Sequence, residues 1–196
     1  DPGDRVAIFM RNRTEFVELY LACFRIGAVA VPINHRFATA EVLFAVTHCA
    51  ARLLIVDGPL LAVVDGLATQ APSLTGIYGY GDTPLDGRVP DWTSVPPAPT
   101  GAWPVVDDAD PAMILYTSGS TGKPKGVTHT HDSIMDTARG RIATQQLTAD
   151  DVALAATAIC HGGGSIGVTF PTLMAGGSVV LLEESEPELL LQALAR

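Results

Sequence analysis

The sequence predicts an α/β fold in which a largely parallel sheet is flanked by helices. Two observations carry this prediction, namely the alternation of strand-like and helix-like segments and the high content of hydrophobic residues. Short apolar runs typical of buried strands alternate with segments of about 10–15 residues whose apolar positions recur at helical spacing. Such alternation is typical of parallel strands joined by crossover helices. Hydrophobic residues make up 47% of the 196 residues, which is ample for a buried core.

Residues 1–81 are expected to form a first βα segment. Thr14 can cap a helix that continues to about Ile26, and Gly27 can end that helix. A second helix is expected to begin with Thr39 as its cap, because apolar residues follow it at helical spacing. The strand-like runs of this segment are residues 5–10, 28–33 and 52–57.

A proline-rich connection is expected over residues 82–111. It contains seven of the fourteen prolines of the chain, so it should have little regular structure. Trp92 and Trp103 lie within it and are expected to hold it to the protein surface by packing.

Regular structure should resume in the third segment, residues 112–196. The expected elements are a strand at 112–116, a loop at 117–126, a strand at 127–129, a helix at 133–147, a strand at 152–160, a glycine break at 162–164, an apolar helix interrupted by Pro171, a strand at 178–182, and a helix from Pro187 that is still running at Arg196.

Composition excludes several classes of protein. The net charge of −9 leaves too few cations for a large nucleic-acid-binding face. No apolar run reaches the roughly 18 residues of a membrane span. The three cysteines, Cys23, Cys49 and Cys160, are expected to be small buried hydrophobic residues in a reducing compartment, which favours the cytoplasm.

The loop at residues 117–126 carries the clearest chemical signal. It combines four hydroxyl residues, three glycines and the only two lysines of the chain, Lys123 and Lys125. Glycines let backbone N–H groups approach an anion, and hydroxyls and lysines bind phosphate oxygens. The loop is not a Walker A sequence, because two residues rather than four separate Gly119 from Gly122. These residues favour a phosphate site, and a polar hairpin is the alternative.

Three stretches of the chain resemble one known family. YTSGSTGKPKGVTHTH (116–131) resembles the phosphate-binding signature of the adenylate-forming, AMP-binding enzymes, which include acyl-CoA synthetases and other acid–thiol ligases. Residues 2–34 and 173–184 are similar to an early and a later region of the same family. The resemblance implies that residues 1–196 are part of the large N-terminal domain of such an enzyme.

The resemblance also implies a two-step reaction. A carboxylic acid reacts with Mg-ATP to give an acyl-adenylate, and coenzyme A then displaces AMP to give a thioester. The alternatives are an adenylation domain that loads a carrier protein and a noncatalytic nucleotide-binding fragment. The cofactor-binding positions are Thr117, Ser118, Gly119, Ser120, Thr121, Gly122, Lys123 and Lys125. Among these, Lys123 occupies a position that varies in the family pattern.

His161 is the candidate catalytic residue. TAICHGGG (157–164) resembles a family segment in which a histidine faces the acid-binding side, although Ala158 replaces a proline there and Cys160 replaces an aromatic residue. A histidine that only completes a turn is the alternative. The family places its ribose-binding, metal-binding and catalytic-lysine motifs farther along, so the resemblance assigns no metal ligand here. It implies that the C-terminal domain is absent and that this chain alone is inactive.

Overall fold

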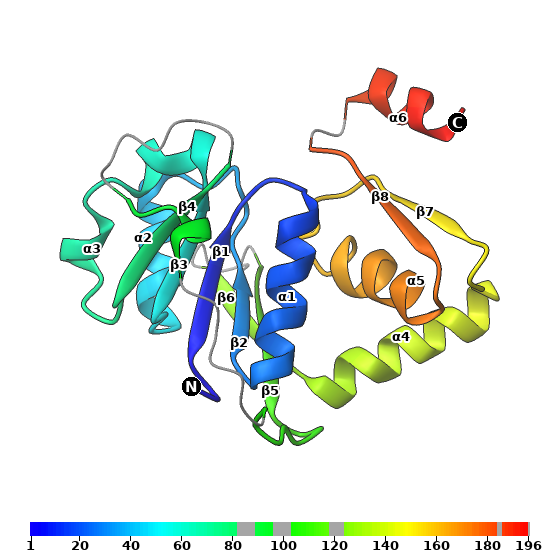
Figure 1. Cartoon of the computed structure of the whole chain (residues 1–196), viewed down its shortest axis with the longest axis horizontal. Coiled ribbons are helices and arrows are strands. Elements are labelled where there is room, and N and C mark those ends of the chain that lie inside the picture. Colours follow the sequence, from blue (N-terminus) through cyan, green and yellow to red (C-terminus); the bar gives the residue numbers. More distant parts are fainter. Residues whose placement is uncertain (82–88, 96–102, 118–123, 184–185, 196) are drawn as a thin grey trace.

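The computed structural model describes residues 1–81, 89–95, 103–117, 124–183 and 186–195. It contains a six-stranded sheet of order β4-β3-β1-β2-β5-β6 and a two-stranded sheet of β7 and β8. Figure 1 shows α2 and α3 beside one part of the larger sheet, and α1, α5 and α4 between that sheet and the smaller one. The predicted α/β class, with a mostly parallel sheet flanked by helices, is therefore confirmed.

The larger sheet is parallel except at one edge. Its strands are β1 (Arg5–Phe9), β2 (Val29–Pro32), β3 (Leu53–Asp57), β4 (Gly76–Tyr80), β5 (Pro111–Thr117) and β6 (Lys125–Thr130). Only β6 runs antiparallel to its neighbour, β5. The inner strands β1, β2 and β3 are apolar at nearly every position because both faces of the sheet are covered. The sequence did not predict β4.

Helix α1 (Thr14–Ile26) has the predicted bounds but a different cap. Arg13, which is extended, is the N-cap, so Thr14 is the first helical residue rather than the cap. Gly27 ends the helix with φ 70°, a left-handed conformation that glycine adopts without strain. The buried face of α1 includes Phe16 and Tyr20, whose rings stack 5.0 Å apart.

Helix α2 (Thr39–His48) also begins one residue after its cap. Ala38 is the N-cap, and its backbone N–H donates to the Glu41 carboxylate at 2.9 Å. The prediction that Thr39 caps this helix is therefore wrong; the Glu41 side chain satisfies the free backbone donor instead. Two short elements follow β3, namely η1 (Gly58–Val64) and α3 (Leu67–Gln70).

The last part of the chain contains α4 (His131–Gln145), β7 (Val152–Ala155), the π-helical turn η3 (Ser165–Thr169), α5 (Phe170–Met174), β8 (Ser178–Leu181) and α6 (Pro187–Leu194). The strand predicted at 152–160 ends at Ala155, because the chain turns into the larger sheet's core there. The helix predicted from Pro187 ends at Leu194.

Pro171 does not interrupt its helix as predicted. The turn before it is widened, since Phe170 N–H donates to the carbonyl of Ser165, five residues earlier. Proline lacks a backbone donor, so it fits at the start of α5, where this π-helical turn passes into regular helix.

Two apolar cores lie on opposite faces of the larger sheet. One joins the sheet to α1, α5 and the 159–166 segment, and the other lies under α2 and α3. In the proline-rich connection, the ring of Trp92 packs edge-on against Tyr78 at 5.9 Å. Trp103 is 51% exposed and lies under the guanidinium of Arg25 at 5.5 Å. Both tryptophans thus contact the folded body, as expected.

Candidate functional site

The candidate phosphate loop joins two antiparallel strands. Thr117 ends β5 and lies directly opposite Lys125, which begins β6. Both are exposed. The other predicted loop residues, Ser118, Gly119, Ser120, Thr121, Gly122 and Lys123, lie outside the described residues. The two strands therefore form a hairpin, as the alternative also expected.

Close packing of the hairpin depends on Gly126. A Cβ at this position would lie 2.9 Å from Cγ2 of Ile114 and 3.5 Å from the ring of Tyr116. The absence of a side chain therefore lets the two strands pack tightly just below the loop. The glycine thus shapes the base of the candidate phosphate site.

The carboxyl ends of the parallel strands meet at the same edge of the larger sheet. β1 and β2 are parallel, and β2 and β5 are parallel, so Asn12, Asn34 and Thr117 all follow or end strands at this edge. Ligands of open α/β sheets bind at such an edge. Thr117 and Lys125 therefore lie at the same edge of the sheet as the segments that follow β1 and β2.

A polar cavity of about 510 Å³ lies at this edge. One wall comes from segments after β1 and β2, and the other comes from segments after β7 and β8. The lining residues are Arg11, Asn12, Asn34, His35, Arg36, Ala156, Thr157, Ala158, His161, Glu183 and Glu186. The cavity thus lies between the two sheets and contains the candidate His161.

His161 is exposed in this cavity, while its backbone closes a turn. Its N–H donates to the carbonyl of Ala158 at 3.0 Å, and its own carbonyl accepts from Ser165 N–H at 3.0 Å. The turn is thus closed by backbone groups and leaves the imidazole free to face the cavity. A Cβ on the next residue, Gly162, would lie 3.3 Å from Leu115 on β5. The His161 turn therefore packs against the strand that carries Thr117.

Cationic groups gather around His35 in the cavity wall. Burial lowers the pKa of His35, and the charges of Arg36, His161 and Arg11 lower it further, while Asp57 raises it. Its Nδ1 is buried without a hydrogen-bond partner in the structure. The lowered pKa favours the neutral form of His35, and the cavity beside it holds both cationic and anionic side chains. The sequence reasoning missed this wall, although its position directly after a buried strand is a usable signal.

The segment after β1 is fixed by a buried carboxylate. Asp57, at the end of β3, has no exposed surface; its Oδ2 accepts from Arg11 at 2.9 Å and its Oδ1 accepts from Arg13 at 3.1 Å. Arg11 also lies 3.4 Å from Glu183, which follows β8. This segment therefore links the ends of strands in both sheets.

Cys160 does not face the cavity. It is buried in the core near Tyr20, and burial raises its pKa to about 11. Its neighbour Ala158 does line the cavity. The two departures from the family pattern thus lie in different environments, Ala158 at the cavity and Cys160 in the core.

His131, expected to order the start of α4, is the first residue of that helix, and its ring packs 5.5 Å from Phe24.

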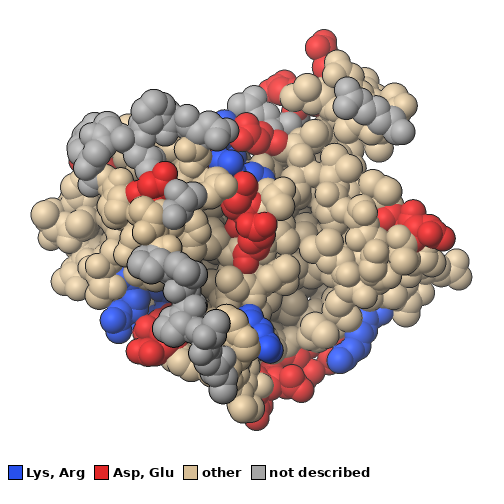
Figure 2. Space-filling view, in the orientation of Figure 1, with Lys and Arg blue, Asp and Glu red and all other residues tan. Residues whose placement is uncertain are grey.

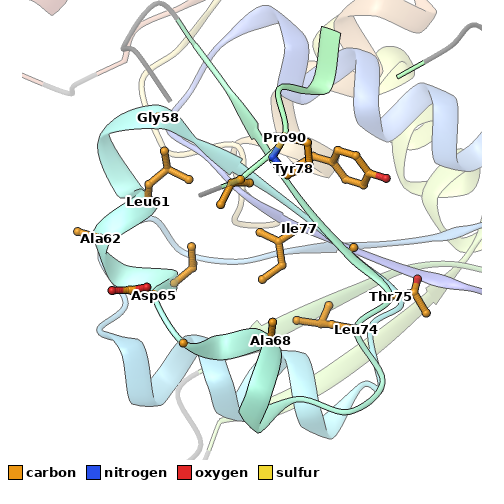
Figure 3. Close-up of a pocket in the computed structure, with 14 residues that line it drawn as sticks. Gly58, Leu61, Ala62, Asp65, Ala68, Leu74, Thr75, Ile77, Tyr78 and Pro90 are labelled. Atoms are coloured by element: carbon orange, nitrogen blue, oxygen red, sulfur yellow. The ribbon is translucent and has the colours of Figure 1, made fainter. Parts of the chain in front are cut away.

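A larger hollow of about 640 Å³ lies elsewhere, between β4, η1 and α3 (Figure 3). Leu61, Ala68 and Ile77 point into it, and the carboxylate of Asp65 points outward. This hollow contains no histidine, lysine or arginine among its described lining residues. The polar cavity is therefore the better candidate for chemistry with anionic substrates.

The charge distribution agrees with the net negative charge. Figure 2 shows several groups of acidic side chains on this face, and small groups of basic side chains, most of which border acidic ones. Among the described residues, no three His, Cys, Asp or Glu side chains form a group that could hold a metal ion. No described helix is both long enough and apolar enough to cross a membrane.

Comparison with known proteins identifies the family. A family model described as AMP-binding enzyme matches residues 1–196. The chain belongs to the AMP-binding enzyme family. This AMP-binding chain is 37% identical over 150 residues to the long-chain-fatty-acid–CoA ligase FadD13 of Mycobacterium tuberculosis, covering 72% of the chain and 27% of that protein. It is 33% identical over 192 residues to a feruloyl-CoA synthase of Amycolatopsis sp, covering 98% of the chain and 36% of that protein.

A solved relative supports the fold of this AMP-binding chain. ATP-bound MatB from Rhodopseudomonas palustris superposes with a TM-score of 0.83 at 29% identity, covering 100% of the chain and 38% of that structure. The chain therefore spans only about a third of the length of these relatives. The large N-terminal part of an adenylate-forming enzyme, expected from the sequence, is the region it matches.

Proposed function

We propose that the protein carrying this chain activates a carboxylic acid with ATP and transfers the acyl group to coenzyme A. The observation that carries the proposal is the shared sheet edge. The hairpin bearing Thr117 and Lys125 opens on the same side as the cavity containing His161. A phosphate loop beside an acid pocket is the arrangement that this reaction needs. The ligase relatives support the same reaction class.

In the first proposed step, a carboxylate oxygen of the acid attacks the α-phosphorus of ATP. The bond from this phosphorus to the bridging oxygen breaks, and pyrophosphate leaves. Lys125 and the hydroxyls of Thr117, Ser118, Ser120 and Thr121 would bind the departing phosphates, with Gly119 and Gly122 giving backbone access. Lys123 would add charge near the same oxygens. Fixed donors of this kind stabilise developing negative charge without reorganising.

His161 would contact the reacting acid, because its imidazole faces the cavity while its backbone holds the turn. In the second proposed step, the coenzyme A sulfur attacks the acyl carbon and AMP leaves. Mg²⁺ enters the proposal only with ATP, since the described residues offer no cluster of metal ligands. A cytoplasmic location is part of the proposal and is supported by the three free cysteines.

The test is ATP–pyrophosphate exchange by the full-length protein with a panel of aliphatic and aromatic acids. We expect exchange that depends on the acid, followed by thioester formation when coenzyme A is added. Lys125→Ala serves as the site control and should lower exchange roughly 10- to 150-fold. If the protein catalyses exchange, forms no thioester with coenzyme A and loads a carrier protein, then the acceptor is a carrier protein and not coenzyme A. No exchange with any acid would refute the proposal.

A further inference from the structure

The side chain of Asn12 joins the two sheets at the cavity. Its Oδ1 accepts from Ile159 N–H at 2.8 Å, and its Nδ2 donates to the carbonyl of Thr157 at 3.3 Å. Asn12 follows β1 and is only 3% exposed. Both ends of one buried amide thus hold the backbone that leads to His161.

A second side chain holds the same backbone from α1. The hydroxyl of Tyr20, which is fully buried, donates to the carbonyl of Ile159 at 2.8 Å. Ile159 therefore has both its N–H and its carbonyl bonded to side chains packed against the larger sheet. These bonds replace the strand ladder that ends at Ala155. Without them, buried backbone groups would lack partners, which is costly.

We infer that Asn12 is a positioning residue that sets the place of His161, and with it the affinity for the acid substrate. The inference rests on the proposed function. Asn12 is itself fixed, because its neighbours Arg11 and Arg13 are both bonded to the buried Asp57. The Thr157–His161 segment is thereby linked, through Asn12 and its neighbours, to Asp57 at the end of β3 in the larger sheet. A shift of this segment would move one cavity wall relative to the other.

The sharpest variants are Asn12→Leu and Asn12→Asp in the full-length protein. Asn12→Leu removes both bonds with little change in size. We expect the KM for the acid to rise about tenfold, the loss typical of one or two hydrogen bonds, while the KM for ATP changes less than about twofold. Tyr20→Phe removes a single bond and should give a smaller rise in the same parameter.

Asn12→Asp adds a pH readout that a merely structural role would not produce. Its carboxylate can still accept from Ile159 N–H but would oppose the Thr157 carbonyl. Burial favours the protonated acid, which can donate to that carbonyl. We expect kcat/KM of Asn12→Asp, relative to wild type, to rise as the pH is lowered from 8 to 6. The same ratio for Asn12→Leu should stay flat.

Val46→Ala is the matched control for general destabilisation, since Val46 lies on the buried face of α2 and is fully buried in the other core. It should lower the melting temperature and leave the KM for the acid unchanged. Hydrogen exchange supplies a readout without turnover: Asn12→Leu should speed exchange in a peptide spanning residues 156–162, and Val46→Ala should not.

Each outcome decides a different question. Unchanged exchange in that peptide, or a normal KM for the acid in Asn12→Leu, overturns the inference while the proposed function stands. Equal changes in Val46→Ala and Asn12→Leu also overturn it. An inactive wild type refutes the proposed function, and peptide exchange then decides whether Asn12 holds this segment at all.

Discussion

The hydroxyl of Tyr116 donates a 3.1 Å hydrogen bond to the carbonyl of Ala45. Tyr116 directly precedes Thr117, the first residue of the candidate phosphate loop. The same hydroxyl lies 2.9 Å from Nδ1 of His48. A hydroxyl has one proton, so His48 must donate from Nδ1 to the Tyr116 oxygen. Burial raises the pKa of Tyr116, which keeps this hydroxyl neutral and able to donate. The end of β5 is thereby fastened to α2.

Tyr116→Phe should lower the free energy of unfolding by about 1–3 kcal/mol, because the Ala45 carbonyl and His48 would both lose a partner. Urea unfolding measures this change. Tyr78→Phe is the control, since it keeps the ring packed against Trp92, and it should cost less than about 0.5 kcal/mol. Equal losses in the two variants would show that the Tyr116 bonds contribute nothing.

Gly126→Ala should destabilise the β5–β6 hairpin. The added methyl would meet Ile114 at 2.9 Å, and forced shifts in a packed region cost about 1–3 kcal/mol. Gly140→Ala is the matched variant, because nothing lies within 4 Å of its Cβ position on α4. That change should stabilise the helix by about 0.5–1 kcal/mol. Thermal unfolding of both variants tests the contrast, and a stabilised Gly126→Ala would contradict it.

Lys125→Ala should impair adenylation more than Lys123→Ala in the full-length protein. Lys125 begins β6 directly opposite Thr117, so its stem is fixed at the base of the loop. Losing a charge-assisted contact to phosphate costs about 1.5–3 kcal/mol, or roughly 10- to 150-fold in kcat/KM. Exchange kinetics at saturating acid measure the difference. Similar effects of the two substitutions would argue against a special role for Lys125.

Cys49 should be the first cysteine to react with a thiol reagent. Burial raises the pKa of Cys23 to about 12 and that of Cys160 to about 11, so neither forms much thiolate at pH 8. Burial raises the pKa of Cys49 as well, but its side chain is only partly buried and is the one a reagent can reach. Mass spectrometry after timed alkylation gives the order, and unfolding in denaturant should equalise the three rates. Early alkylation of Cys160 in the folded protein would contradict the described burial.

The sequence predicted the elements whose burial is uniform. The runs at β1, β2 and β3 are apolar at nearly every position, because helices cover both faces, and this pattern is visible without a structure. Gly27 marked the end of α1 for an equally local reason, its left-handed backbone. The two strands expected on either side of the candidate phosphate loop are also present, as β5 and β6.

Other features depend on contacts between distant residues. β4 reads GIYGY and is only half-buried, so it lacks the apolar signature of the inner strands. The strand predicted at 152–160 is apolar to its end, but Asn12 and Tyr20 bind its second half in place of a neighbouring strand. The Arg11–Asp57 pair spans 46 positions of the chain, and no local pattern could indicate it.

The β5–β6 ribbon is joined to the larger sheet unevenly. β5 has one register pair with β2, Ala30 with Met113, against six pairs with β6. At its far end the ribbon is pinned where His131 N–H donates to the carbonyl of Asp110 at 3.2 Å. A strand of this length extends about 20 Å at roughly 3.3 Å per residue. Thr117 and Lys125 therefore owe their place to bonds at both ends of the ribbon, those of Tyr116 to α2 at one end and that of Asp110 to His131 at the other.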